Sequence, residues 1–139
     1  MAESKLLSKY GSSTANNHII LVIDDEEAFC DVVCEILDSL GYKTRHAYDA
    51  HQAIDLLQEI TPDLILSDVM MPDIDGLTFI RRLRSEPKWS EIPIIIVSAK
   101  ASKDDREAAE SAGADGYLIK PFSSHELEEL ISGTLASHE

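Results

Sequence analysis

The sequence predicts an α/β fold in which helices cover both faces of a five-stranded parallel sheet, a doubly wound arrangement. Strand and helix signals alternate five times along the chain, which is the pattern of successive β-α-β units with right-handed crossovers. Four of the predicted strands contain short, continuous apolar runs, as expected for strands buried on both faces. These runs lie at residues 19–23, 64–66, 94–97 and 117–119.

The first half of the chain contains two of these units. A strand predicted at His18–Ile23 precedes a helix at about Glu26–Leu40, whose apolar residues recur at helical spacing. Gly41 is the expected left-handed end of that helix. The segment Lys43–Tyr48 is the most polar strand, so we expect it at an edge of the sheet. A second helix begins near Asp49.

The second half repeats the alternation. Gly113 is expected to end the fourth helix, and the last helix opens with Ser123 and Glu126 at the spacing of a capping box. The predicted elements here are strands at Asp63–Ser67, Ile92–Val97 and Asp115–Ile119, and helices at 77–83, Lys103–Ala112 and from Ser123 onward.

The length and composition indicate one domain without a membrane-spanning segment. A chain of 139 residues matches a single domain, and no apolar run approaches the roughly 20 residues that cross a bilayer. The first residues are polar and lack the apolar core of a secretory signal. We therefore expect a flexible tail at 1–17, one domain at 18–137, a cytoplasmic location and no contact with a membrane.

The charge balance constrains the partners. Lys and Arg number 12 and Asp and Glu 26, which gives a net charge of −14. This disfavours direct contact with nucleic acid, because such contact depends on Lys and Arg neutralising phosphates. Divalent metals and cationic protein partners fit better. Cys30 and Cys34 are the only cysteines, and we interpret them as packing residues on the first helix.

Three carboxylates are predicted to meet at one edge of the sheet. Asp24 and Asp25 follow the first strand, and Asp68 follows the third. Because the carboxyl ends of parallel strands line one crevice, these groups would repel one another strongly without a cation among them. Mg²⁺ prefers oxygen ligands and takes only a few carboxylates, which matches a shallow site. The alternative, that Asp24 and Asp25 only cap the following helix, leaves Asp68 unexplained.

Two further polar residues end apolar strands. Lys120 follows the last strand, where burying a lysine is costly unless it faces anions. Ser98 ends the fourth strand, and its hydroxyl can donate to a phosphoryl oxygen. A triad nucleophile is a poorer interpretation of Ser98, because no G-x-S-x-G turn surrounds it. These residues and the three aspartates predict a site for a phosphoryl group and a metal ion.

Four segments hold these residues: VIDDEE (22–27), LILSDVMMPDIDG (64–76), PIIIVSAK (93–100) and GADGYLIKPF (113–122). They resemble, in this order and at this spacing, the receiver domain of two-component response regulators, including the single-domain chemotaxis regulators. The resemblance covers about residues 18–135, nearly the whole chain. It implies a flavodoxin-like (βα)5 fold with the strand order 2-1-3-4-5.

The resemblance also implies roles for the acidic residues. Asp68 matches the aspartate that accepts the phosphoryl group and also binds the metal. Asp25 matches the direct Mg²⁺ ligand, and Asp24 matches the carboxylate that acts through water. Met70 matches the position that gives its backbone carbonyl to the metal. Mg²⁺ is thus the implied cofactor, with Mn²⁺ as a substitute.

Three more positions match the family's switch and its phosphoryl-binding groups. Ser98 matches the hydroxyl residue that turns to bond the phosphoryl group, and Tyr117 matches the aromatic residue whose rotamer follows that move. Lys120 matches the lysine that binds a phosphoryl oxygen, so Asp68, Lys120 and Ser98 are the implied catalytic residues. The Lys120–Pro121 peptide bond is implied to be cis.

We therefore expect a receiver domain of a phosphorelay that takes its phosphoryl group from a sensor histidine kinase or a histidine phosphotransfer protein. It would be a signalling switch rather than an enzyme, although it assists its own phosphorylation and dephosphorylation. A downstream protein would bind the face formed by Lys103–Ala112, Asp115–Ile119 and the last helix. That helix has no arginine, which favours a monomer or weak dimer. A piece of a longer hybrid kinase or regulator is an alternative to a stand-alone protein.

Two other function classes are alternatives. Phosphatases of the haloacid dehalogenase type also use an aspartate nucleophile and Mg²⁺ on a doubly wound sheet. They need an Asp-x-Asp motif after the nucleophile strand, whereas this chain has the adjacent pair Asp24-Asp25 and a lone Asp68. A degenerate receiver that binds partners without phosphorylation is the other alternative, and the complete set of acceptor-site residues argues against it.

Overall fold

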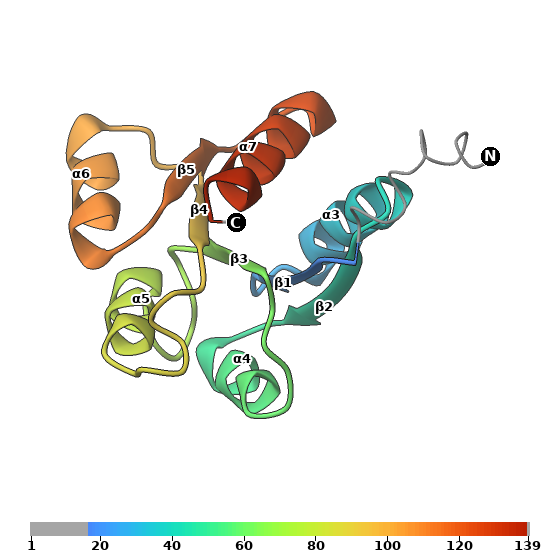
Figure 1. Cartoon of the computed structure of the whole chain (residues 1–139). Coiled ribbons are helices and arrows are strands. Elements are labelled where there is room, and N and C mark those ends of the chain that lie inside the picture. Colours follow the sequence, from blue (N-terminus) through green and yellow to red (C-terminus); the bar gives the residue numbers. More distant parts are fainter. Residues whose placement is uncertain (1–16, 139) are drawn as a thin grey trace.

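Five parallel strands form the central sheet in the order β2-β1-β3-β4-β5 (Figure 1). The computed structural model describes residues 17–138. Both the strand order and the alternation with helices agree with the predicted doubly wound, flavodoxin-like fold. The strands are β1 (Ile19–Ile23), β2 (Lys43–Ala47), β3 (Leu64–Asp68), β4 (Ile94–Ser98) and β5 (Gly116–Ile119).

The helices cover the two faces of the sheet unequally. The buried side chains of α4, α5 and α6 share one hydrophobic cluster with the sheet, and those of α3 and α7 share another on the opposite face. Figure 1 shows the same two groups on the two sides of the strands. The helices are α3 (Glu27–Ser39), α4 (Ala50–Leu57), α5 (Gly76–Arg84), α6 (Lys103–Ala112) and α7 (Ser124–Ser137).

Strand β1 illustrates why the apolar runs are continuous. Successive side chains of a strand point to opposite faces. Leu21 and Ile23 belong to the cluster beneath α4, α5 and α6, whereas Ile20 and Val22 belong to the cluster beneath α3 and α7. All four side chains are buried, so the strand lacks a polar alternation. Strand β2 is instead largely exposed and lies at an edge of the sheet, as predicted.

The predicted helix ends are largely confirmed. Gly41 and Gly113 have left-handed φ angles of 96° and 115°, which side chains with a Cβ rarely adopt. Helix α6 has the predicted bounds, and Ser123 and Glu126 form the reciprocal capping box at the start of α7. Helix α7 continues through Gly133 to Ser137.

Strand boundaries differ from the prediction by one or two residues. Asp68 is the last residue of β3 rather than the first residue of the following loop, because it still pairs with Val97 of β4. Strand β4 likewise extends to Ser98, which pairs with Ile119 of β5. The sheet therefore holds the backbone of Asp68 and Ser98 directly.

Two further predictions concern the N-terminal tail and membrane-spanning segments. The predicted tail at 1–17 lies outside the described residues, except for Asn17. Among residues 17–138, no helix combines the length and the apolar character that spanning a membrane requires.

Candidate functional site

The candidate site lies at the carboxyl ends of four neighbouring strands. Asp24 follows β1, Asp68 ends β3, Ser98 ends β4 and Lys120 follows β5. The strands are parallel, and in the sheet they lie in the order β1, β3, β4, β5. Their carboxyl ends therefore open on one edge of the sheet, which is where ligands bind in open α/β folds. The residues predicted to converge come from segments up to 96 positions apart.

Three carboxylates form the acidic part of the site. Asp24, Asp25 and Asp68 each place one carboxylate oxygen within 4.8 Å of the others. Asp24 and Asp68 are buried, with 1% and 8% of their surface exposed, whereas Asp25 is exposed. The cluster thus has a buried side against the sheet and an open side at Asp25. Oxygen ligands at this spacing, reachable from solvent, fit a hard divalent cation.

Lys120 places its ammonium group between two of these carboxylates. The Nζ atom lies 3.0 Å from Asp24 Oδ2 and 3.8 Å from Asp68 Oδ2. It also lies 4.0 Å from the centre of the Phe29 ring, which favours a cation over its face. One ammonium group cannot neutralise three ionised carboxylates, so the cluster keeps a surplus of negative charge.

Asp24 serves two purposes. Its Oδ1 accepts a hydrogen bond of 2.9 Å from the Glu26 N–H, while its Oδ2 faces Lys120. The alternative interpretation, that Asp24 and Asp25 only cap the first helix, does not hold: Glu26 is the N-cap residue of α3, and Asp24 accepts from the N–H of Glu26 itself, before the helix begins. Capping also leaves Asp68 and Lys120 unexplained.

The environment of Asp68 changes its proton affinity. Burial raises the pKa of the Asp68 carboxyl above its ordinary value, and repulsion by Asp24 raises it further. Lys120 and the N–H groups of Met70 and Val69 oppose this shift without cancelling it. The Val69 N–H donates to Asp68 Oδ1 at 2.7 Å, and the Met70 N–H lies 3.4 Å from the same oxygen. One oxygen of Asp68 is thus oriented by the backbone, and the other faces Lys120.

Ser98 and Tyr117 lie on the adjacent strands β4 and β5. Ser98 is 1% exposed, and its hydroxyl oxygen accepts a hydrogen bond from the Lys100 N–H at 3.0 Å. Tyr117 is half-buried and donates its hydroxyl to the Lys100 carbonyl at 2.8 Å. The two residues predicted to act together therefore bind the same residue of the loop that follows β4.

The remaining predicted residues have the following positions. Met70 lies two residues after Asp68, with 59% of its surface exposed, so its side chain does not fill the site. The Lys120–Pro121 peptide bond is cis, the isomer that the resemblance implies.

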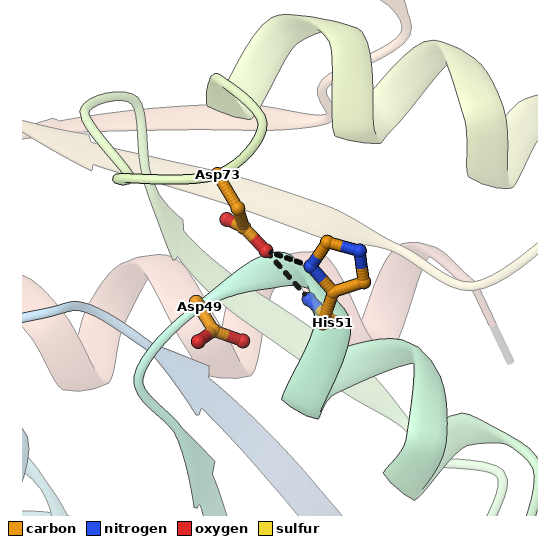
Figure 2. A group of neighbouring side chains, drawn as sticks. All are labelled: Asp49, His51 and Asp73. Atoms are coloured by element: carbon orange, nitrogen blue, oxygen red, sulfur yellow. Dashed lines mark hydrogen bonds and ion pairs between the residues drawn. The ribbon is translucent and has the colours of Figure 1, made fainter.

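A second group of polar side chains has no counterpart among the predicted residues. Asp49, His51 and Asp73 lie together where the loop after β3 meets the start of α4 (Figure 2). Asp73 belongs to the segment 64–76, but the sequence does not indicate its partner, because His51 precedes it by 22 positions. A carboxylate that caps a distant helix has no local spacing rule of the kind that identifies a capping box.

The sequence matches a model of the response regulator receiver domain over residues 20–132. That range contains every residue of the candidate site.

Solved structures with the same fold agree with this match. The signal receiver domain of a signal transduction histidine kinase from Syntrophus aciditrophicus is 30% identical, with a TM-score of 0.80 over 86% of this chain and 91% of that chain. The receiver domain of sensor histidine kinase PA1611 from Pseudomonas aeruginosa PAO1 is 32% identical, with a TM-score of 0.79 over 86% and 98%. It was crystallised with a magnesium ion coordinated in its active site cleft. The chemotaxis response regulator CheY4 of Vibrio cholerae is 27% identical, with a TM-score of 0.80 over 84% and 98%.

Proposed function

This chain belongs to the family of response regulator receiver domains, the signalling domains of two-component systems, and on that premise we propose that Asp68 is its phospho-acceptor. Receiver domains work with histidine kinases or histidine phosphotransfer proteins. The donor we propose here is a phosphohistidine on such a protein, in the cytoplasm. The function is that of a switch whose phosphorylation changes the binding of a partner.

One observation carries the assignment of Asp68. The Lys120 ammonium lies within 3.0 Å of Asp24 and 3.8 Å of Asp68, at a sheet edge where both carboxylates are buried. A phosphoryl group attached to Asp68 would place its oxygens next to this ammonium, and a point charge of this kind suits phosphate.

The donor set of the site fits Mg²⁺. Asp24, Asp25 and Asp68 would hold the ion, since their oxygens lie within 4.8 Å of one another and carry more negative charge than Lys120 offsets. Burial is the main cause of the raised pKa of Asp68, and repulsion by Asp24 adds to it. The Met70 carbonyl is the further ligand that the family match supports. When bound, the ion neutralises charge on the transferred phosphoryl oxygens.

The transfer itself needs few protein groups. An ionised Asp68 oxygen attacks phosphorus, the P–N bond to the donor imidazole breaks, and that imidazole keeps the electron pair and takes up a proton. No separate base is required, because the nucleophile is already deprotonated. Lys120 binds one phosphoryl oxygen, and the Ser98 hydroxyl turns from the Lys100 N–H to donate to another. The chain thus assists its own phosphorylation without turning over a separate substrate.

The same move supplies a route to a partner. The backbone of the loop residue Lys100 is bound by two side chains, Ser98 at its N–H and Tyr117 at its carbonyl. If Ser98 turns toward the phosphoryl group, only the bond from Tyr117 remains. The loop and the Tyr117 ring can then rearrange together. Tyr117 lies on the α6–β5–α7 face, which is the docking surface that we propose for the downstream protein.

Phosphorylation by a small donor tests this function. Incubation of the full chain with Mg²⁺ and acetyl phosphate should add one phosphoryl mass in an intact-mass measurement, and Asp68→Asn should add none. Asp63→Asn is a matched control, because Asp63 is an exposed aspartate that precedes the amino end of the same strand. An unmodified wild type, or an Asp68→Asn variant that gains the same mass, would overturn the assignment.

The phosphatase alternative makes a different prediction. An enzyme of that class would release phosphate from phosphomonoesters through many cycles. For the switch that we propose, a turnover assay with p-nitrophenyl phosphate should show no more release than the Asp68→Asn variant does.

A further inference from the structure

Helix α4 takes half of its N-terminal cap from a distant residue. The local cap Asp49 accepts a hydrogen bond from the Gln52 N–H at 2.8 Å. The two preceding N–H groups of the helix, from Ala50 and His51, donate instead to the two carboxylate oxygens of Asp73, at 3.1 and 2.9 Å. The first N–H groups of a helix have no partner within the helix, so both aspartates satisfy donors that would otherwise need water.

Asp73 makes this contact with both oxygens, and Figure 2 shows the bonds of one of them, Oδ2, to the His51 N–H and the His51 ring. Its Oδ2 also lies 2.6 Å from His51 Nδ1, and its Oδ1 accepts from the Ile74 N–H at 2.8 Å. Burial raises the pKa of Asp73, but the N–H groups of His51, Ala50 and Ile74 and the His51 ring together hold that pKa below its usual range. The carboxylate is therefore ionised and fully used as an acceptor. This occupancy indicates a link between two segments rather than an open metal site.

The segment that Asp73 ties down is the loop 69–75, which directly follows Asp68. At its start, the Val69 and Met70 N–H groups orient Asp68 Oδ1, at 2.7 and 3.4 Å. At its end, the Gly76 N–H donates to the Val69 carbonyl at 2.7 Å. The backbone is close-packed there, since a Cβ on Gly76 would lie 2.5 Å from the Asp68 carbonyl oxygen. A shift of this loop would therefore move the groups that orient the acceptor carboxylate.

We propose that Asp73 is a positioning residue for the phosphorylation site: by binding the N-terminus of α4, it fixes the loop whose N–H groups orient Asp68. The link joins an element on one face of the sheet to the acidic cluster without touching the cluster. This inference rests on the proposed function, because it assigns Asp73 a role in metal binding and phosphorylation at that site.

The binding of Mg²⁺ alone tests the proposal, with two variants at the same helix end. Asp73→Ala removes the link to the loop, whereas Asp49→Ala removes only the local cap. Both should lower the thermal midpoint, since each leaves N–H groups of α4 without an acceptor. Only Asp73→Ala should weaken Mg²⁺ binding to the folded full chain, measured by calorimetry, by about tenfold, the low end for groups that orient metal ligands.

Two further variants separate positioning from loss of stability. Asp73→Asn keeps one acceptor oxygen and should recover part of the lost affinity. His51→Ala removes the ring contact but keeps the His51 N–H, so its affinity should lie closer to wild type. Phosphorylation by acetyl phosphate should show the same distinction. In Asp73→Ala the Mg²⁺ concentration that gives the half-maximal rate should rise, while the rate at saturating Mg²⁺ should change less.

Two results would contradict the positioning role of Asp73. Equal Mg²⁺ affinity in wild type and Asp73→Ala, or equal weakening in Asp73→Ala and Asp49→Ala, would overturn the positioning role. If Asp73→Ala fails to fold, Asp73→Asn decides the question by the same measurements. A wild type that neither binds Mg²⁺ nor accepts a phosphoryl group would instead overturn the proposed function, and with it this inference.

Discussion

The side chains of Ser98 and Tyr117, on adjacent strands, bind the backbone N–H and the backbone carbonyl of the same loop residue, Lys100. Ser98 accepts from the Lys100 N–H at 3.0 Å, and Tyr117 donates to the Lys100 carbonyl at 2.8 Å. A cavity of about 70 Å³ is lined by Tyr117 and by Val69, the residue after Asp68. The loop after β4 is thus held by the Ser98 hydroxyl at the end of β4 and by the aromatic residue on the α6–β5–α7 face.

The shared contact predicts coupling between these two residues. Ser98→Ala and Tyr117→Phe should each lower the free energy of unfolding by about 0.5–1.5 kcal/mol, because Lys100 is exposed and water replaces part of each lost hydrogen bond. The double variant should deviate from additivity by about 0.5 kcal/mol or more, since both side chains bind one residue. Urea unfolding of the four proteins measures this coupling. Strict additivity would show that the two contacts are independent.

The raised pKa of Asp68 predicts a pH-dependent cost in stability. A carboxyl whose pKa is higher in the folded state binds its proton more tightly when folded, so stability falls as pH rises from the unfolded pKa, about 3.9, to the folded value. Above the pKa of Asp68 in the folded state, the full loss of stability is present. Without divalent ions, Asp68→Asn should therefore be more stable than wild type at about pH 7, and this advantage should vanish near pH 4.

Magnesium should reverse the order of the two proteins at neutral pH. The proposed Mg²⁺ site forms only in the folded state, so the ion should stabilise wild type by mass action, and Asp68→Asn should lack one ligand of the site. Thermal unfolding across pH, with and without Mg²⁺, measures both effects. Asp55→Asn, at an exposed aspartate of α4, serves as the control. A stability difference between wild type and Asp68→Asn that does not depend on pH would contradict the prediction.

Truncation of the Arg84 side chain should cause a large loss of stability. From the end of α5, its guanidinium donates to the carbonyls of Gly113, Ser90 and Ile92 and pairs with Asp115 at 2.9 Å. It thereby satisfies backbone acceptors in the two segments that precede β4 and β5. Arg84→Ala should cost about 2–4 kcal/mol in urea unfolding, because several acceptors lose their donor together.

A neighbouring arginine provides the control for Arg84. Arg82 lies on the exposed side of the same helix, and Arg82→Ala should change the free energy of unfolding by less than about 0.5 kcal/mol. Arg84→Lys should not rescue, since an ammonium group lacks the planar set of donors. A loss below 1 kcal/mol for Arg84→Ala, in a sample folded by circular dichroism, would show that water replaces the guanidinium.

Two glycines should respond to alanine in opposite directions. A Cβ at Gly76 would lie 2.5 Å from the Asp68 carbonyl oxygen and 2.8 Å from Val69 Cα, so the backbone must shift. Gly76→Ala should cost about 1–3 kcal/mol and slow phosphorylation by acetyl phosphate. Gly133, inside α7, has open space at the same position apart from the backbone of its own helix, and Gly133→Ala should stabilise by about 0.5–1 kcal/mol. Equal effects of the two changes in urea unfolding would contradict the steric argument.

The sequence predicted most of the site because its signals are local. A buried parallel strand is recognised from a short apolar run, and the residues after it must lie at the carboxyl edge of the sheet. Asp24, Ser98 and Lys120 could therefore be placed together without coordinates. The exact end of a strand was less predictable: Asp68 lies inside β3 because its backbone still pairs with β4, and that pairing is not visible in a single segment.

The sequence by itself thus determined the order and type of the elements, the burial of the strands and the edge of the sheet where acidic and basic groups meet. Only the tertiary structure decided which long-range partners bind the loops: Asp73 on the N-terminus of α4, Arg84 on the carbonyls before β4 and β5, and Tyr117 on Lys100. Periodicity and capping spacings span a few residues, whereas these contacts join residues 6 to 29 positions apart. Their geometry follows from how the loops pack around the finished sheet.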